Sequence, residues 1–131
     1  MKLDLSFDRV LSHPVEAVWA SFTDPAALGE WLMANDFAPR RGHRFTFRGE
    51  PMPGWRGWTV CEVLEIEPPR RMVWAWQGAE DDDTTVTIEL TPVPEGTRLI
   101  LRHTGDTDPT IADLIASGWP GKLQALTAHL G

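Results

Sequence analysis

DPTIADLIASGWPGKLQALTAHL, residues 108–130, predicts one long amphipathic helix, on which the rest of the fold depends. It begins with an aspartate followed by a proline, which is a typical start for a helix. Its apolar residues recur at spacings of three and four, as they do on one face of a helix. A helix with this single stripe must pack on a broad apolar sheet built by the rest of the chain. The stripe contains Ile111, Leu114, Ile115, Trp119, Leu123, Leu126 and Leu130.

Pro120 is the irregular position of this predicted helix. Proline has no backbone N–H, so the carbonyl of Ala116 loses its helical donor. Gly118 and Gly121 weaken the same turn. We expect a kink here, which would lie over the mouth of any cavity beneath the helix and shape it.

The central part of the chain has the two-residue period of β-strands. The segments 43–48, 84–90 and 98–103 each alternate apolar residues mainly with charged residues or threonine. Such alternation predicts strands with one buried face and one wet face. Short turns that contain glycine or proline separate the segments, which favours an antiparallel meander because parallel pairs need long crossovers.

The N-terminal part predicts one strand followed by two short helices. Apolar and polar residues alternate over residues 3–7, which indicates a half-buried strand that ends near Leu11. The pairs His13-Pro14 and Asp24-Pro25 are helix starts with proline at the first helical position. The residues that these helices are expected to bury are Val15, Val18, Trp19, Phe22, Leu28, Trp31 and Leu32.

Together these elements predict an α+β fold in which a curved antiparallel sheet of about six to seven strands wraps around the C-terminal helix. A helix with its side chains is only about 10 Å wide. A strongly curved sheet therefore leaves an apolar, ligand-sized space at one end of the helix. The length suits a single domain over residues 1–131, since no linker or repeat divides the chain.

Charge and composition narrow the range of partners. Nineteen acidic and twelve basic residues give a net charge of -7, which disfavours nucleic acid and anionic membranes. We interpret the basic run 40–44 and the acidic run 80–83 as exposed turns. The N-terminus has no apolar stretch like a signal peptide or membrane helix, and the single Cys61 cannot form an internal disulfide. We expect a cytoplasmic protein that does not insert into membranes.

Metal and cofactor sites have no motif in this sequence. The four histidines fall on different predicted elements and lack the HExxH or paired-cysteine spacings of zinc sites. The glycines do not form a GxxxxGK[ST] or GxGxxG phosphate loop. We therefore expect neither a metal nor a cofactor. The histidines are His13, His43, His103 and His129.

Seven tryptophans are the unusual feature of the composition. Indole combines a large apolar surface with one N–H donor, so these rings gather in cores, at interfaces and around pockets. Both core packing and pocket lining remain open for each ring. Trp55 and Trp58, in the Pro/Gly-rich segment 51–58, are candidates for a pocket lid or for contact with a second copy or another protein. The candidate ligand-binding residues are Trp31, Phe45, Phe47, Met72, Trp74, Trp76, His103, Trp119 and Leu123.

Two residues are candidates for acid–base chemistry. His103 lies on the predicted inward face, where it is either a hydrogen-bonded structural histidine or a polar or acid–base contact for a ligand. Glu62 lies between Cys61 and Val63 and either faces outward or aims its carboxylate at a ligand. No nucleophile with an adjacent base can be assembled from sequence alone.

Four stretches of the chain carry a resemblance to a known superfamily. They are RVLSHPVEAVWASFTDPAALGEW (9–31), EVLEIEPPRRMVWAW (62–76), GTRLILRHTG (96–105) and GWPGKLQALTAHL (118–130). In this order they resemble the SRPBCC or START-like superfamily, and more narrowly the branch named after the activator of the heat-shock-protein-ninety ATPase.

The resemblance implies the helix-grip fold, a sheet closed on a long C-terminal helix. It also implies a small hydrophobic ligand, aromatic or lipid-like, in the space between sheet and helix. Because the superfamily hosts several activities, two alternatives stay open. One is a cyclase- or hydratase-like enzyme that acts on an aromatic or polyketide-like substrate. The other is a co-chaperone-like protein-interaction module, for which the name of the branch implies a role in the stress response.

Overall fold

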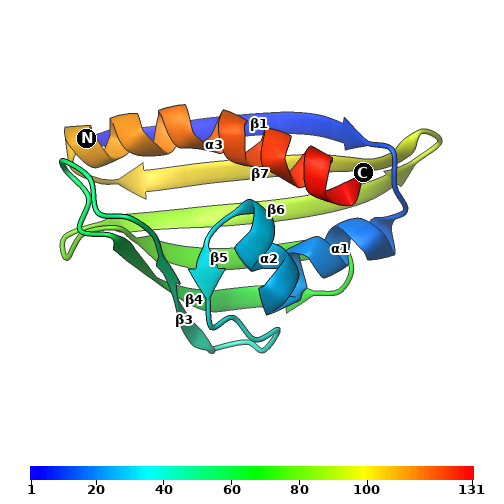
Figure 1. The fold of residues 1–131 in the computed structure, drawn as a ribbon, viewed down its shortest axis with the longest axis horizontal. Coiled ribbons are helices and arrows are strands. Elements are labelled where there is room, and N and C mark those ends of the chain that lie inside the picture. The colour runs from blue at the N-terminus through cyan, green and yellow to red at the C-terminus, as the bar shows by residue number, and fades with distance from the viewer.

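The computed structural model describes residues 1–131, which form one seven-stranded antiparallel sheet and three helices. This confirms the predicted α+β architecture, with the long C-terminal helix packed on the sheet (Figure 1). The strands are β1 Lys2–Leu11, β2 Ala34–Asn35, β3 Arg44–Arg48, β4 Trp58–Glu67, β5 Arg71–Gln77, β6 Asp83–Val93 and β7 Gly96–Asp106. The helices are α1 Val15–Thr23, α2 Pro25–Trp31 and α3 Pro109–Leu130.

The sheet is a meander closed at one edge by the first strand. Its order is β1-β7-β6-β5-β4-β3-β2, so each strand from β2 to β6 pairs with the next one along the chain. β1 then pairs antiparallel with β7, from Lys2 opposite Asp106 to Leu11 opposite Thr97. Figure 1 shows α3 lying along β7 and β1, while α1 and α2 cover the part of the sheet nearer β4 to β6. The same face of the sheet is therefore covered by two different sets of helices.

The helix α3 follows its predicted pattern closely. The Asp108 carboxylate accepts a hydrogen bond from Thr110 N at 2.7 Å and caps the first turn. Pro120 does not divide the helix, which continues from Pro109 to Leu130. Ala116 and Pro120 are both exposed, so water can reach the carbonyl that lacks a helical donor. Pro120 lies on the solvent side of α3, away from the sheet.

The two N-terminal helices begin differently from each other. At α2 the prediction is confirmed, because Pro25 is the first helical residue and the Asp24 side chain accepts from Ala26 N. At α1 the prediction is wrong by one residue, because Pro14 is extended, with φ -66° and ψ 155°, and the helix begins at Val15. The chain is held there by β7, whose Thr97 hydroxyl donates to the carbonyl of His13.

The two charged runs form turns, as predicted. The exposed side chains of Arg40 and Arg41 lie in the turn before β3. In the acidic run, however, Asp82 is only 9% exposed. Its carboxylate accepts hydrogen bonds from Gly78 N and Ala79 N, each at 2.9 Å, and from the Thr107 hydroxyl. Asp82 thus fixes the β5–β6 turn and ties it to the segment before α3.

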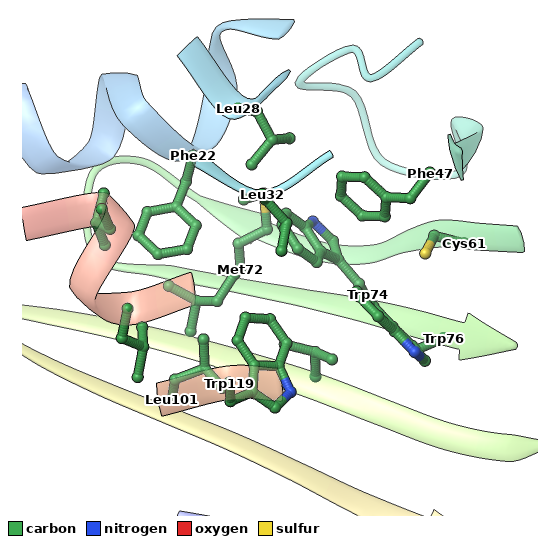
Figure 2. Packing of buried hydrophobic residues seen from close by; sticks show 14 of the residues in the cluster. Phe22, Leu28, Leu32, Phe47, Cys61, Met72, Trp74, Trp76, Leu101 and Trp119 are labelled. Atoms are coloured by element: carbon green, nitrogen blue, oxygen red, sulfur yellow. The ribbon is translucent and has the colours of Figure 1, made fainter. Parts of the chain in front are cut away.

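Beneath α1 and α2, the core is a solid aromatic cluster, which consists of Phe22, Phe37, Phe45, Phe47 and Trp74. The ring of Trp74 lies 5.5 Å from that of Phe45 and 6.5 Å or less from the other three rings. All five residues are at most 4% exposed. Figure 2 shows Phe22 and Phe47 on either side of Trp74, with Met72 beside them. This half of the sheet is fully covered.

Candidate functional site

A cavity of about 410 Å³ lies at the other end of the sheet, between α3 and the ends of β4 and β5. The segment 49–57, which connects β3 to β4, contributes another part of its wall. The lining is mainly apolar. From α3 it includes Ile111, Leu114, Ile115 and Trp119, and from the rest of the chain Leu32, Met33, Met52, Trp55 and Trp76.

Two of the predicted ligand-binding residues, Trp76 and Trp119, form facing parts of this wall. Trp76 points inward from β5 and Trp119 points toward it from α3, with ring centroids 5.7 Å apart. Both are at most 7% exposed, so the rings pack mainly against protein and only a small part of each borders the cavity. Figure 2 shows the two rings on their separate elements. A helix and a strand distant in sequence thus build one aromatic site.

A chain of hydrogen bonds fixes both of these elements. Trp119 Nε1 donates to His103 Nδ1 at 3.0 Å, which assigns the histidine proton to Nε2. His103 Nε2 then donates to Thr84 Oγ1 at 3.0 Å, and the Thr84 hydroxyl donates to the backbone carbonyl of Trp76 at 2.6 Å. Every donor in this chain meets an acceptor, so the indole of Trp119 is held in one orientation.

His103 is a structural histidine in this arrangement. It is fully buried, and this burial lowers the pKa of its imidazole from 6.5 to about 3. The ring is therefore neutral at ordinary pH, and both of its nitrogens already have partners. His103 does not line the cavity. The structure places it behind Trp119, where it positions that ring and does not face a ligand.

Glu62 lies on the outer face of the sheet. Its neighbours Cys61 and Val63 are buried, whereas its carboxylate forms an ion pair with Arg44 at 3.2 Å. The two residues are direct partners in the β3–β4 register. Glu62 is thus on the opposite side of the sheet from the cavity, which is the outward-facing alternative left open by the sequence.

Six other predicted ligand-binding residues are packed into the solid core and do not line the cavity. Each is at most 2% exposed. Four of them lie on the half of the sheet that α1, α2 and the segment with Phe37 cover, and Trp31 and Leu123 pack into the same core from α2 and α3. The indole N–H of Trp31, for example, donates to the carbonyl of Ser21 at 2.8 Å within this core. The six residues are Trp31, Phe45, Phe47, Met72, Trp74 and Leu123.

The segment 49–57 is the part of the site that alternation of apolar residues does not predict. Trp55 lines the cavity and donates its indole N–H to Thr59 Oγ1 at 3.2 Å. Met52 and Trp55 also exchange two backbone hydrogen bonds, at 3.1 and 2.9 Å. The signal for this segment was its composition, PMPGWRGW, which already suggested a lid.

Gly54 lets this segment approach α3 closely. Its φ is +87°, and a Cβ on it would lie 2.3 Å from the Thr110 side chain at the start of α3. The segment therefore packs against the N-terminal turn of the helix and closes that side of the cavity. Trp58, in contrast, is 40% exposed, lies outside the cavity and stacks with the Arg56 guanidinium at 4.7 Å.

Lys122 is the cationic group of the cavity lining, and the sequence patterns did not reveal it. It lies one turn after Trp119 on α3, and its Nζ donates to the carbonyl of Leu32, at the end of α2, at 2.8 Å. The only sequence feature that places it there is its spacing of three residues from Trp119, which puts both side chains on the same side of the helix. Glu50, the acidic group of the lining, is exposed on the segment 49–57 and forms no ion pair.

The chain offers no cluster of metal ligands. Nowhere do three or more His, Cys, Asp or Glu residues come together in a way that could hold a metal ion. No helix is both long enough and apolar enough to cross a membrane.

Comparison with known proteins assigns the family. The family described as "Activator of Hsp90 ATPase homolog 1-like protein" matches residues 12–131, which is nearly the whole chain. The chain belongs to this family. The predicted superfamily and its branch are thereby confirmed, and with them the helix-grip fold. The family suggests a ligand-binding or polyketide-cyclase-like protein. A search of the curated proteins gives no match.

Solved structures with the same fold support the assignment. Protein MLL2253 from Mesorhizobium loti is 34% identical, with a TM-score of 0.86 over 97% of this chain and 96% of that one. Protein NE0264 from Nitrosomonas europaea is 26% identical, with a TM-score of 0.80 over 98% and 94%. CalU16 from Micromonospora echinospora is 25% identical, with a TM-score of 0.74 over 99% and 76%.

Proposed function

We propose that this protein binds a small apolar ligand, planar and aromatic or lipid-like, in the cavity between α3 and the sheet. One observation carries the proposal: a space of about 410 Å³ that no side chain fills is lined mainly by apolar side chains, among them the indoles of Trp55, Trp76 and Trp119. Ligand pockets commonly measure about 300–1,000 Å³ and are lined mainly by apolar and aromatic side chains. The cavity has both properties.

The rigidity of the site supports this function. His103 and Thr84 hold the Trp119 ring and the Trp76 backbone through one continuous set of hydrogen bonds. A ligand therefore loses little affinity to ordering of the wall when it binds. Trp55, on the segment 49–57, supplies a third ring from the side of the cavity that is not part of the sheet or of α3.

Binding is favoured over catalysis by the location of the acid–base candidates. His103 lies behind Trp119 with both nitrogens occupied, and Glu62 lies on the outer face. A contact with a second copy or another protein through the segment that contains Trp55 and Trp58 stays a prediction. In that case Trp58 would be the contact, since Trp55 lines the cavity.

The chain offers a matched pair of glycines for testing the proposal. Gly118 and Gly121 are both in α3, and a Cβ added to either one would meet no atom within 4 Å, but only Gly118 lines the cavity. Gly118→Phe should place a ring in the cavity, while Gly121→Phe should place the same ring in solvent. Both changes replace a helical glycine, so neither should reduce the stability of the helix.

The measurement is titration with naphthalene derivatives, followed by intrinsic tryptophan fluorescence and by calorimetry. We expect saturable binding to the wild type and to Gly121→Phe, and at least tenfold weaker binding to Gly118→Phe, which corresponds to about 1.4 kcal/mol. Native mass spectrometry of protein purified from its host should show a stoichiometric small-molecule adduct. No binding by any planar compound, or equal binding by both variants, would contradict the proposal.

A further inference from the structure

The cavity contains an indole N–H without a protein partner. The N–H groups of Trp31, Trp55 and Trp119 each donate to a protein acceptor. Trp74 Nε1 is sealed in the aromatic cluster and is the one fully buried side-chain nitrogen or oxygen without a partner. Trp76 Nε1 has no protein acceptor either, but its residue lines the cavity, so this nitrogen keeps contact with the open space.

A second donor without an acceptor lies next to it. Thr59 lines the cavity and is only 2% exposed. Its Oγ1 accepts from the Trp55 indole, but its own hydroxyl proton has no protein acceptor. Cys61 on β4 is the direct partner of Trp76 on β5, so Thr59 is the diagonal neighbour of Trp76 on the same inward face. Diagonal neighbours in an antiparallel pair have Cα atoms about 7–8 Å apart.

The floor of the cavity therefore carries two hydrogen-bond donors, the Trp76 indole N–H and the Thr59 hydroxyl, that lack a protein acceptor. Buried donors without acceptors cost free energy unless a ligand or water supplies an acceptor. A carbonyl oxygen has two lone pairs and can accept from both groups at once. The other polar side chains of the lining are already partnered or exposed. Lys122 donates to the carbonyl of Leu32, Ser117 donates to the carbonyl of Asp113, and Glu50 is exposed.

We infer that the ligand carries a carbonyl oxygen on its apolar body, and that this oxygen accepts hydrogen bonds from Trp76 Nε1 and Thr59 Oγ1. The inference rests on the proposed function and adds the chemistry of the polar end. The apolar body would contact the apolar lining, which includes Trp55 and Trp119, while the oxygen points to Thr59 and Trp76 at the floor formed by β4 and β5. Ketones, esters and amides of planar aromatic compounds have this combination of groups.

A pair of probes that differ only in the carbonyl tests the inference. Acetylnaphthalene and ethylnaphthalene have nearly the same shape, and only the first can accept a hydrogen bond. Their dissociation constants should be measured by calorimetry with the full chain for wild type, Trp76→Phe and Thr59→Val. Trp74→Phe is the matched control. It also removes an unpartnered indole N–H from β5, but Trp74 does not line the cavity.

We expect Trp76→Phe to weaken acetylnaphthalene binding by about three- to tenfold, the usual contribution of one neutral hydrogen bond. Thr59→Val should act in the same direction. Ethylnaphthalene binding should change by less than about twofold in both variants, and Trp74→Phe should leave the ratio of the two probes at its wild-type value.

The emission of an acyl-dimethylaminonaphthalene dye provides a readout of the hydrogen bond itself. Hydrogen bonding to the carbonyl of such a dye shifts its emission to longer wavelengths. Bound to Trp76→Phe, the dye should therefore emit at shorter wavelengths than when bound to the wild type. Equal losses for both naphthalene probes, or the same loss in Trp74→Phe, would overturn the inference while the apolar cavity remained. Failure of the wild type to bind either probe would overturn the proposed function and this inference together.

Discussion

Trp74 and Trp76 lie two residues apart on the same face of β5, yet their surroundings differ completely. Trp74 is fully buried and touches four phenylalanine rings of the aromatic cluster. Trp76 contacts Phe47 on one side and the cavity and Trp119 on the other. Figure 2 shows Trp74 and Trp76 on β5, with Phe47 and Met72 nearby. The strand thus determines which face of the sheet a ring occupies, while the covering elements determine whether the ring becomes part of the solid core or borders the cavity.

The covering elements explain why the two halves differ. Over Trp74, α1 and α2 bring Phe22 and Leu28, and the following segment brings Phe37, so the space is filled. Over Trp76, the cover consists of α3 and the segment 49–57, which close the sides without filling the middle. Close packing in the first half stabilises the fold, and the gap in the second half is available for function.

The largest effect is expected on the free energy of unfolding, when the aromatic cluster around Trp74 is disrupted. Trp74→Ala should reduce the free energy of unfolding by about 3–5 kcal/mol, because it leaves a large hole inside the aromatic cluster. Trp76→Ala should cost at least about 1 kcal/mol less, since one side of this ring already borders a cavity. Chemical denaturation of the two variants measures both values. Equal losses would show that the two halves are packed alike.

A pH effect tests the hydrogen bonds behind Trp119. Burial lowers the pKa of His103 from 6.5 to about 3, so the folded protein stays unprotonated there while the unfolded chain takes up a proton below pH 6.5. His103 therefore makes stability fall as the pH drops from 6.5 to about 3, by about 1.4 kcal/mol for each pH unit. Above pH 6.5 it adds no pH dependence.

The variant His103→Gln isolates this contribution, because the other titrating groups stay the same. Denaturation between pH 6.5 and pH 5 should show a shallower loss of stability in the variant than in the wild type. If both proteins lose stability with the same slope, the imidazole is not shielded as the structure indicates.

The third effect concerns the segment 49–57, which forms one wall of the cavity. Trp55→Ala should weaken the binding of a planar apolar ligand by about tenfold, on the assumption that the ring covers about 50 Å² of ligand at about 25 cal/mol per Å². Trp58→Ala is the control, since that ring lies in the same region but outside the cavity. Calorimetric titration distinguishes them, and equal effects would mean that Trp55 is not a wall of the site.

The smallest effect is expected on the outer face. Glu62→Gln removes one exposed ion pair with Arg44 and should change the free energy of unfolding by only about 0.5 kcal/mol. Ligand affinity should stay the same, because the residue is on the other side of the sheet. A tenfold change in affinity would reopen Glu62 as part of the functional site.

Sequence patterns predicted the helices and strands well, but they did not predict which inward-facing side chains are packed in the core and which line the cavity. The stripe on α3 and the alternation in β3, β6 and β7 identified inward-facing residues, because these patterns depend only on local geometry. The same patterns assigned Trp74 and Trp76 equally to a ligand, although only Trp76 lines the cavity. Whether a ring on β5 is covered depends on Phe37, α1 and α2. These lie elsewhere in the sequence, so the pattern within β5 contains no information about them.

The same limit explains the other differences. Lys122 was missed because its place in the lining depends on the end of α2, which lies far away in the sequence. Pro120 was expected to shape a cavity mouth, but it lies on the exposed side of α3, where the missing hydrogen bond can be replaced by water. His103 was correctly placed inward, but its two partners, Thr84 and Trp119, come from other elements.

An NMR titration that observes the indole N–H signals during addition of acetylnaphthalene would show directly whether the cavity is the binding site. Seven tryptophans give seven such signals, distributed between the two halves of the molecule and its surface. We predict that the signals of Trp55 and Trp76 move most and that Trp119 moves less, because its N–H donates to His103. The signals of Trp31 and Trp74, in the solid half, should stay in place. Shifts at Trp31 and Trp74 that equal those at Trp76, or no shifts at any indole, would contradict the assignment of the cavity as the binding site.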